Sequence, residues 1–78
     1  MIMKEGFLSY DENIGRYDVV FMDGSRHGGL YCGDTFEVFR KNSWVSTRIE
    51  YSASGMWYLA GLDRKLILNG LRVRNVRA

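Results

Sequence analysis

The sequence has 78 residues, which is enough for one small domain and too short for two of ordinary size. Apolar types make up 46% and charged types 26%, a balance that excludes disorder, while a formal net charge of +2 by itself favours no class of partner. A chain of this length buries only about 60% of its surface on folding, which leaves little room for a deep active site. We therefore expect residues 1–78 to form a single domain that binds rather than catalyses and needs no cofactor.

Several sequence features favour the cytoplasm. Cys32 is the only cysteine, which excludes an intramolecular disulfide, whereas secreted domains of this size usually carry several. Lys4 and Glu5 follow directly after three apolar residues, so the start has no signal-peptide pattern. The longest apolar stretch, 56–62, is far shorter than the ~20 residues that span a bilayer. We expect a cytoplasmic protein with no membrane contact.

Glycine spacing and the absence of proline favour an all-β fold. Nine glycines punctuate the chain, and no stretch of helical length keeps an apolar period of 3.6 without a glycine. In chain order, we expect strands over 5–10, 16–22, 35–40, 44–52, 56–60 and 71–76.

The order of these elements points to one architecture. A Gly-rich loop over 25–34 precedes three hairpin-linked strands, a connector over 61–69 with at most one turn of 3₁₀ helix, and a final strand. This order predicts a small SH3-like barrel of five to six antiparallel strands, with the strand at 5–10 along one edge. An OB-type barrel, which usually has a helix between its third and fourth strands, and a small open sheet are the alternatives.

Alternation along two strands separates a core face from an outer face. In the final strand, Leu71 and Val73 are expected inward, with Arg72 and Arg74 outward. In the longest strand, one face carries Val45, Thr47, Ile49 and Tyr51, and the other carries Trp44, Ser46, Arg48 and Glu50.

Four segments carry a resemblance to a known family. The segments are 29–38, the run Trp-Val-Ser-Thr-Arg-Ile-Glu at 44–50, 57–62 and 68–74. Together they resemble a family of short uncharacterised proteins from Gram-positive bacteria and their phages and mobile elements, a domain of unknown function. The likeness spans 5–74 and implies a whole-length domain with no assigned chemistry, so it brings no catalytic residues. A looser similarity to Tudor-like and bacterial SH3-like modules implies binding of peptides, modified side chains or nucleic acid, with Trp44 and either Tyr31 or Tyr58 as the aromatic candidates.

The candidate site is an outward Trp/Arg surface. Its residues are Trp44, Arg48, Arg72 and Arg74, with Arg40 and Lys41 at the hairpin tip. An indole beside guanidinium groups suits single-stranded nucleic acid, and Trp and Arg are also enriched at protein interfaces. A third interpretation gives Trp44 a structural role, capping an open barrel end under arginine stems. We favour an unidentified protein partner, recognised as an acidic or extended segment or through an exposed edge strand. Nucleic acid bound through the basic second half of the chain is the alternative, and a homodimer is compatible with either.

Charge is distributed unevenly between the two halves of the chain. Residues 1–39 carry three basic and seven acidic side chains, a net charge of −4, and residues 40–78 carry eight basic and two acidic ones, a net charge of +6. Such asymmetry marks either nucleic-acid contact or complementary charges on neighbouring strands, and we favour the second.

Three other groups of residues are expected to have structural roles and not to bind a metal or phosphate or to act in catalysis. His27 and Cys32 are too few for a four-ligand zinc site, so Cys32 is expected to be a small buried hydrophobe at a turn. The glycines near 28–33 lack a phosphate-loop ending, and the carboxylates are expected at turns and solvated strand edges.

Overall fold

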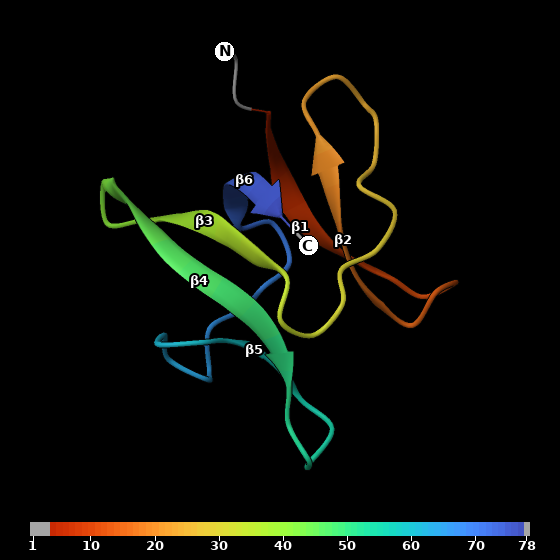
Figure 1. The fold of residues 1–78 in the computed structure, drawn as a ribbon, viewed down its shortest axis with the longest axis vertical. Coiled ribbons are helices and arrows are strands. Elements are labelled where there is room, and N and C mark those ends of the chain that lie inside the picture. Colours follow the sequence, from red (N-terminus) through yellow and green to blue (C-terminus); the bar gives the residue numbers. More distant parts are fainter. Residues whose placement is uncertain (1–3, 78) are drawn as a thin grey trace.

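The computed structural model describes residues 4–77 and contains six antiparallel strands with no helix in that range (Figure 1). The strands are β1 (Glu5–Asp11), β2 (Arg16–Phe21), β3 (Thr35–Arg40), β4 (Ser43–Tyr51), β5 (Trp57–Leu59) and β6 (Arg72–Arg77). The prediction of an all-β fold with five to six antiparallel strands is therefore confirmed, and five of the six predicted ranges shift by one residue at one or both ends.

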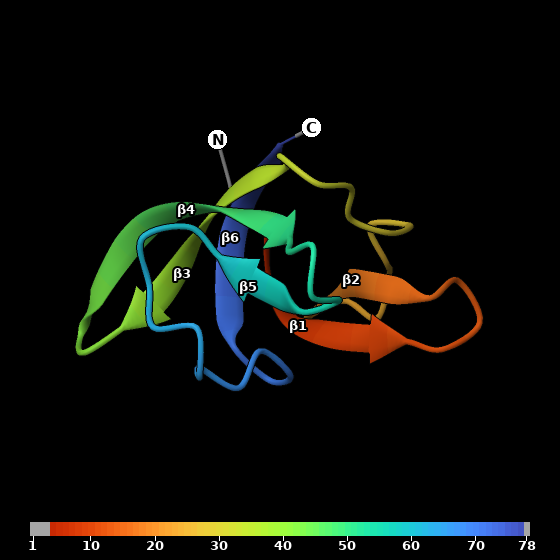
Figure 2. The same ribbon diagram turned by 90° about the horizontal axis from the view of Figure 1, so that it is seen from below.

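All six strands belong to one sheet in the order β2-β1-β6-β3-β4-β5. The sheet curls into a half-barrel, consistent with a small SH3-like barrel, so that β5 comes near β1 and β2 at the other end of the sheet (Figure 2). The expectation that the first strand lies along an edge is wrong, because β1 pairs with β2 on one side and with β6 on the other. Strand β6, which is the last strand in the sequence, lies centrally between β1 and β3 (Figure 1).

The core lies on the concave side of this sheet, where alternate strand residues point. Of the residues predicted on this face, Ile49 and Val73 are fully inaccessible and Thr47 is buried. Val45 and Leu71 are half-buried and pack against the core, whereas Tyr51 is exposed. The connector contributes Leu68, which is buried, and Leu62 and Leu66, which pack against the core. The buried apolar set is Leu8, Val19, Leu30, Phe36, Val38, Ile49, Leu59, Leu68 and Val73.

Two departures from ordinary strand geometry position the outer face. Lys41 and Asn42 form the two-residue turn between β3 and β4, and both have positive φ (47° and 65°), as a type I′ turn requires. Asn75 also has positive φ (59°) and lies where the β3–β6 register shifts, between Thr35 and Glu37. The shift is a β-bulge, so the alternation of β6 changes after Asn75.

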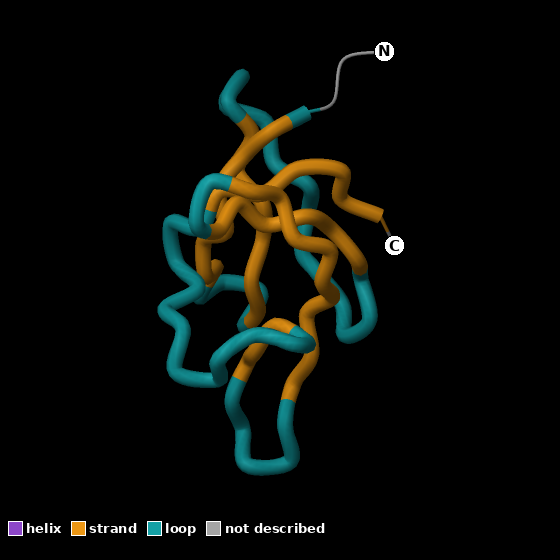
Figure 3. The backbone as a smooth tube through the Cα atoms, turned by 90° about the vertical axis from the view of Figure 1, so that its left-hand side faces the viewer, coloured by secondary structure: helices purple, strands orange, loops and turns teal. Residues whose placement is uncertain are grey.

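The two edges of the sheet differ. The loop 22–34 runs beside β2 and donates or accepts backbone hydrogen bonds through Ser25, His27 and Leu30 (Figure 1). The described backbone consists of strands and loops throughout (Figure 3). Strand β5 has only three residues, and its Trp57 ring contacts Tyr17 of β2 across the open side of the half-barrel. The edges are therefore joined by aromatic packing rather than by strand pairing.

Three side chains of the long loop region differ from expectation. Cys32 is exposed, so its expected role as a buried hydrophobe is wrong. Asp18 and Asp34, expected at solvated positions, are 2% and 6% exposed. Asp18 Oδ1 accepts hydrogen bonds from the amides of Val19, Gly28 and Gly29, and Asp34 Oδ2 accepts one from the Tyr31 amide. The Asp18 carboxylate thus holds the loop to β2, whereas the Asp34 carboxylate closes the turn at the end of the loop, and these hydrogen bonds allow both groups to be buried. No helix in residues 4–77 is long and apolar enough to cross a membrane.

Candidate functional site

The outer surface of the β3–β4 hairpin carries a pair of aromatic rings. The two-residue turn aligns Phe39 opposite Trp44, and the alternation of both strands points the two side chains away from the core. Their ring centroids are 5.2 Å apart at an interplanar angle of 60°, an edge-type contact. Both rings are half-buried, so part of each remains accessible.

Two arginines from β6 lie over this aromatic pair. The Arg74 guanidinium carbon is 4.2 Å from the centre of the Trp44 ring. Arg72 lies 5.5 Å from the Trp44 ring and 5.4 Å from the Phe39 ring. These distances fall within the range of cation–π interaction. We call the surface formed by Phe39, Trp44, Arg72 and Arg74 the Trp/Arg face.

Both arginines of the Trp/Arg face also bind carboxylates on neighbouring strands. Arg74 Nε donates to Glu37 of β3 at 2.9 Å, and Arg72 pairs with Glu5 of β1 at 2.6 Å. Each pair joins an acid of the first half of the chain to a base of the second half. The interpretation of the charge asymmetry as complementary charge on neighbouring strands therefore holds for these two pairs. Each guanidinium is held between a ring and a carboxylate.

The other three predicted site residues lie elsewhere. Arg48 shares the outer face with Trp44 but lies four residues along β4, about 13 Å away at ~3.3 Å per residue, and it pairs with Glu50 at 2.9 Å. Arg40 is opposite Ser43, next to the turn, so it lies at the hairpin tip. It is one position away from Phe39, so alternation places its side chain on the opposite side of the sheet from Phe39. Lys41 is exposed at the turn.

Sequence reasoning missed Phe39 although a signal existed. Phe39 alternates with Val38 and lies directly across the hairpin turn from Trp44, so the outward face of β3 could have been derived in the same way as that of β4. The other aromatic candidates are not part of this face. Tyr31 contacts Arg16, with the guanidinium carbon 4.4 Å from the ring centre, and Tyr58 contacts Arg64 at 3.8 Å.

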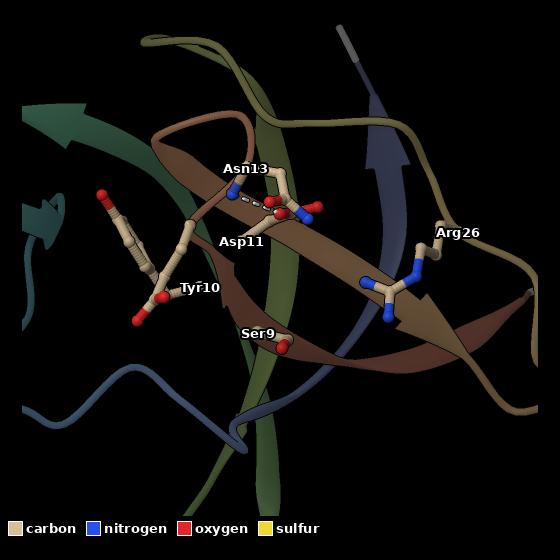
Figure 4. Close-up of a pocket in the computed structure, with 6 residues that line it drawn as sticks. Ser9, Tyr10, Asp11, Asn13 and Arg26 are labelled. Atoms are coloured by element: carbon tan, nitrogen blue, oxygen red, sulfur yellow. Dashed lines mark hydrogen bonds between the residues drawn. The ribbon is translucent and has the colours of Figure 1, made fainter.

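Among the hollows on the surface of residues 4–77 are two of different character. A polar one of about 440 Å³ lies beside the β1–β2 turn, where Arg26 reaches across β2 toward Asp11 and Asn13 (Figure 4). It contains no residue of the Trp/Arg face. A smaller one, about 160 Å³, lies over β3, β4 and β6, and Glu37, the partner of Arg74, contributes to its lining. Within residues 4–77, no three His, Cys, Asp or Glu side chains converge as a metal site.

Comparisons with known proteins agree with the fold. Residues 6–75 match a family described as a domain of unknown function (DUF5348). The chain is similar to a protein from Ruminococcus gnavus whose crystal structure came from the Northeast Structural Genomics Consortium, with 49% sequence identity and a TM-score of 0.81. The alignment covers 91% of this chain and 99% of that one. No curated protein matches the sequence.

Proposed function

The chain belongs to the family DUF5348, and we propose that it is a non-enzymatic binding module that recognises a protein partner through the Trp/Arg face. The observation that carries this proposal is the contact of the Arg74 guanidinium with the Trp44 ring at 4.2 Å, while Glu37 holds the same guanidinium. Trp and Arg are enriched among the few residues that carry most of the binding energy of protein interfaces. Side chains that are already held in place lose less conformational entropy when a partner binds.

The charge state of the face favours a protein over nucleic acid. Nucleic-acid affinity comes chiefly from cationic side chains that neutralise phosphates. Arg72 and Arg74 already share their charge with Glu5 and Glu37, and a phosphate chain would approach those carboxylates as well. A protein surface with an apolar contact and a few polar groups fits this balanced patch better.

The buried carboxylates of the described chain have structural roles, which supports a binding role for the protein. Asp18 and Asp34 are the two buried carboxylates in the described chain, and backbone amides of the loop engage both. Their hydrogen bonds give them a structural task. This supports a binding module rather than an enzyme built around paired carboxylates.

The proposal also covers cellular context. An exposed free thiol at Cys32 suits a reducing compartment, which supports the cytoplasm. The resemblance stated from the sequence motifs supports an origin in Gram-positive bacteria or their mobile elements.

Affinity capture from a host lysate tests the proposal. We compare the wild-type chain with Trp44→Ala and with a matched control, Tyr31→Ala, which removes an exposed aromatic ring that also contacts an arginine. We expect proteins captured by the wild type and the control to be lost from Trp44→Ala. Thermal unfolding of each variant establishes that it is folded. A folded Trp44→Ala variant that captures the same proteins would show that this face is not the binding site.

A second measurement addresses the nucleic-acid alternative. Labelled single- and double-stranded DNA and RNA are titrated with the protein at increasing salt. We expect no binding at low salt. Micromolar binding that weakens steeply as salt rises would replace the protein partner with nucleic acid.

A further inference from the structure

The smaller hollow continues the Trp/Arg face along β3 and β4. Glu37 belongs to both, since it pairs with Arg74 and also lines the hollow. Beyond Glu37, the hollow presents the hydroxyl-bearing residues Thr35 and Ser46, both exposed. Its full lining is Thr35, Phe36, Glu37, Ser46, Thr47, Asn75 and Arg77.

The bulge in β6 brings Arg77 to this hollow. Without the register shift, strict alternation would put residue 77 on the same side as Val73. After Asn75, Val76 packs against the core, and Arg77 lies exposed opposite Thr35. Nε and Nη2 of Arg77 both donate to Asn75 Oδ1 at 3.3 Å. The side chain of the residue at the bulge therefore also holds the Arg77 guanidinium beside the hollow.

The hollow is flanked by positive charge on both sides of β3. Thr35 is opposite Arg77 of β6 and opposite Arg48 of β4 in the sheet register. Within residues 4–77, the side-chain partner of Arg77 is the neutral amide of Asn75, whereas Arg48 and Arg74 pair with Glu50 and Glu37. Three guanidinium groups therefore face two carboxylates, which leaves a local excess of one positive charge.

We propose that this hollow binds the carboxylate of an acidic side chain from a protein partner, while an apolar side chain of the same segment packs on Trp44 and Phe39. This inference rests on the proposed function and deepens it. Thr35 and Ser46 offer hydroxyl donors, and Arg77 offers a charge-assisted hydrogen bond to the bound carboxylate.

The register sets the spacing of the two partner residues. The Phe39–Trp44 pair and the Thr35–Arg48 pair are four positions apart on β3 and β4, about 13 Å at ~3.3 Å per residue. In an extended partner segment, residues four positions apart span the same length and point to the same side. The partner therefore carries an apolar and an acidic residue separated by three others.

A single carboxylate fits the site better than a polyphosphate. The excess positive charge at the hollow is one. We call the surface between the Phe39–Trp44 pair and the Thr35–Arg48 pair the strip. The strip contains Glu37, with Glu5 and Glu50 beside it. Repeated phosphates along this strip would meet three carboxylates. An isolated acidic side chain meets Arg77 at the basic end, where Glu37 and Glu50 are already paired with Arg74 and Arg48.

The test uses the synthetic peptide Gly-Ser-Leu-Ser-Gly-Ser-Glu-Ser-Gly with both ends blocked, and a second peptide of reversed sequence, because either chain direction satisfies the spacing. Each is titrated into ¹⁵N-labelled protein and followed by NMR. We expect at least one to shift the Trp44 indole signal together with the amides of Thr35 and Ser46 and the Arg77 Nε signal. Replacing Glu by Gln in that peptide is expected to weaken binding about tenfold, equivalent to ~1.4 kcal/mol.

Protein variants separate the two ends of the strip. The double variant Arg48→Gln, Arg77→Gln is expected to bind the Glu and Gln peptides equally while the Trp44 indole still responds. Equal binding of the two peptides to the wild type, with Trp44 responding, would overturn the carboxylate site and leave the proposed face intact. Shifts at Thr35, Ser46 and Arg77 without any response of Trp44 would keep an anion site but separate it from the proposed face. Absence of shifts at Thr35, Ser46 and Arg77 would overturn the inference. It would also be overturned if an oligothymidylate displaced the peptide at a concentration lower than that of the peptide.

Discussion

Tyr17 on β2 and Trp57 on β5 pack edge to face, with ring centroids 6.3 Å apart and an interplanar angle of 80°. These residues belong to the two outermost strands of the sheet, so their contact closes the half-barrel. The series extends on both sides, because Tyr10 packs on Tyr17 at 5.2 Å and Tyr51 packs on Trp57 at 4.6 Å. A row of four rings thus covers the open side of the core.

Removing the Trp57 ring should open this closure. We expect Trp57→Ala to lower the free energy of unfolding by about 3 kcal/mol, the lower end of the range for large aromatic residues, because Trp57 is half-buried. Urea unfolding measures the change. Tyr58→Ala, a substitution in the same strand on the opposite face, is the control and should cost less. An unchanged urea midpoint for Trp57→Ala would show that the row is not part of the stabilising core.

The stability of the protein should fall in alkali partly through Tyr17. Burial raises the pKa of the Tyr17 hydroxyl above its ordinary value of 10.0, and the neighbouring Tyr10 adds to the rise. The unfolded chain therefore loses this proton at a lower pH than the folded chain, so the free energy of unfolding falls as the pH rises above about 10. Urea unfolding of the wild type and Tyr17→Phe across this range should give a shallower fall for the variant. Parallel curves would contradict this origin.

Gly6 should tolerate no side chain. A Cβ at this position would lie 2.4 Å from the Val20 carbonyl oxygen and 2.9 Å from Val19 Cγ1, so β1 and β2 would have to separate. We expect Gly6→Ala to cost about 3 kcal/mol or more, at the upper end of overpacking effects. Thermal unfolding checks this against Ser9→Ala on the same strand. A melting temperature within experimental error of the wild type would show that the strands shift at little cost.

Asp18 should control the order of the long loop. Its Oδ1 accepts the amides of Val19, Gly28 and Gly29, so Asp18→Ala leaves buried donors without an acceptor, at a cost of about 2 kcal/mol or more. Hydrogen exchange at Gly28 and Gly29 should accelerate in this variant more than exchange in β4. In Asp18→Asn, which retains an acceptor oxygen, exchange at these two amides should be faster than in the wild type and slower than in Asp18→Ala. Unchanged protection of the two glycine amides in Asp18→Ala would contradict this role.

The sequence predicts local alternation well and long-range register poorly. Period-two alternation correctly separates Ile49 from Trp44 and Val73 from Arg74, because each depends only on neighbours in one strand. The pairing of Arg72 with Glu5 depends on the position of β6 beside β1, which no local pattern encodes. Arg40 lies next to the turn, as its sequence position predicts, and alternation with Phe39 directs its side chain to the other side of the sheet.

The bulge hides one end of the candidate site from sequence reasoning. Asn75 adopts a positive φ, which asparagine tolerates better than most other residues, but an asparagine within a strand does not by itself predict the change of phase that brings Arg77 outward. Burial in the loop is equally hard to foresee. Cys32 and Asp34 lie close together in the same glycine-rich segment, yet Cys32 is exposed and Asp34 is buried, because the carboxylate binds a loop amide.

The central position of β6 has a consequence for the nascent chain. The hairpins β1–β2 and β3–β4 are translated first, and the strand that joins them is made after both. Until β6 arrives, each hairpin presents an unpaired strand to solvent and to the other hairpin. Because these joining contacts connect residues far apart in sequence, we expect productive folding to wait for translation of residues 72–77 and to be slow for a chain of this size. A chain that stops before residue 72 would leave the two hairpins without the strand that joins them, whereas a chain that includes β6 can pair with both.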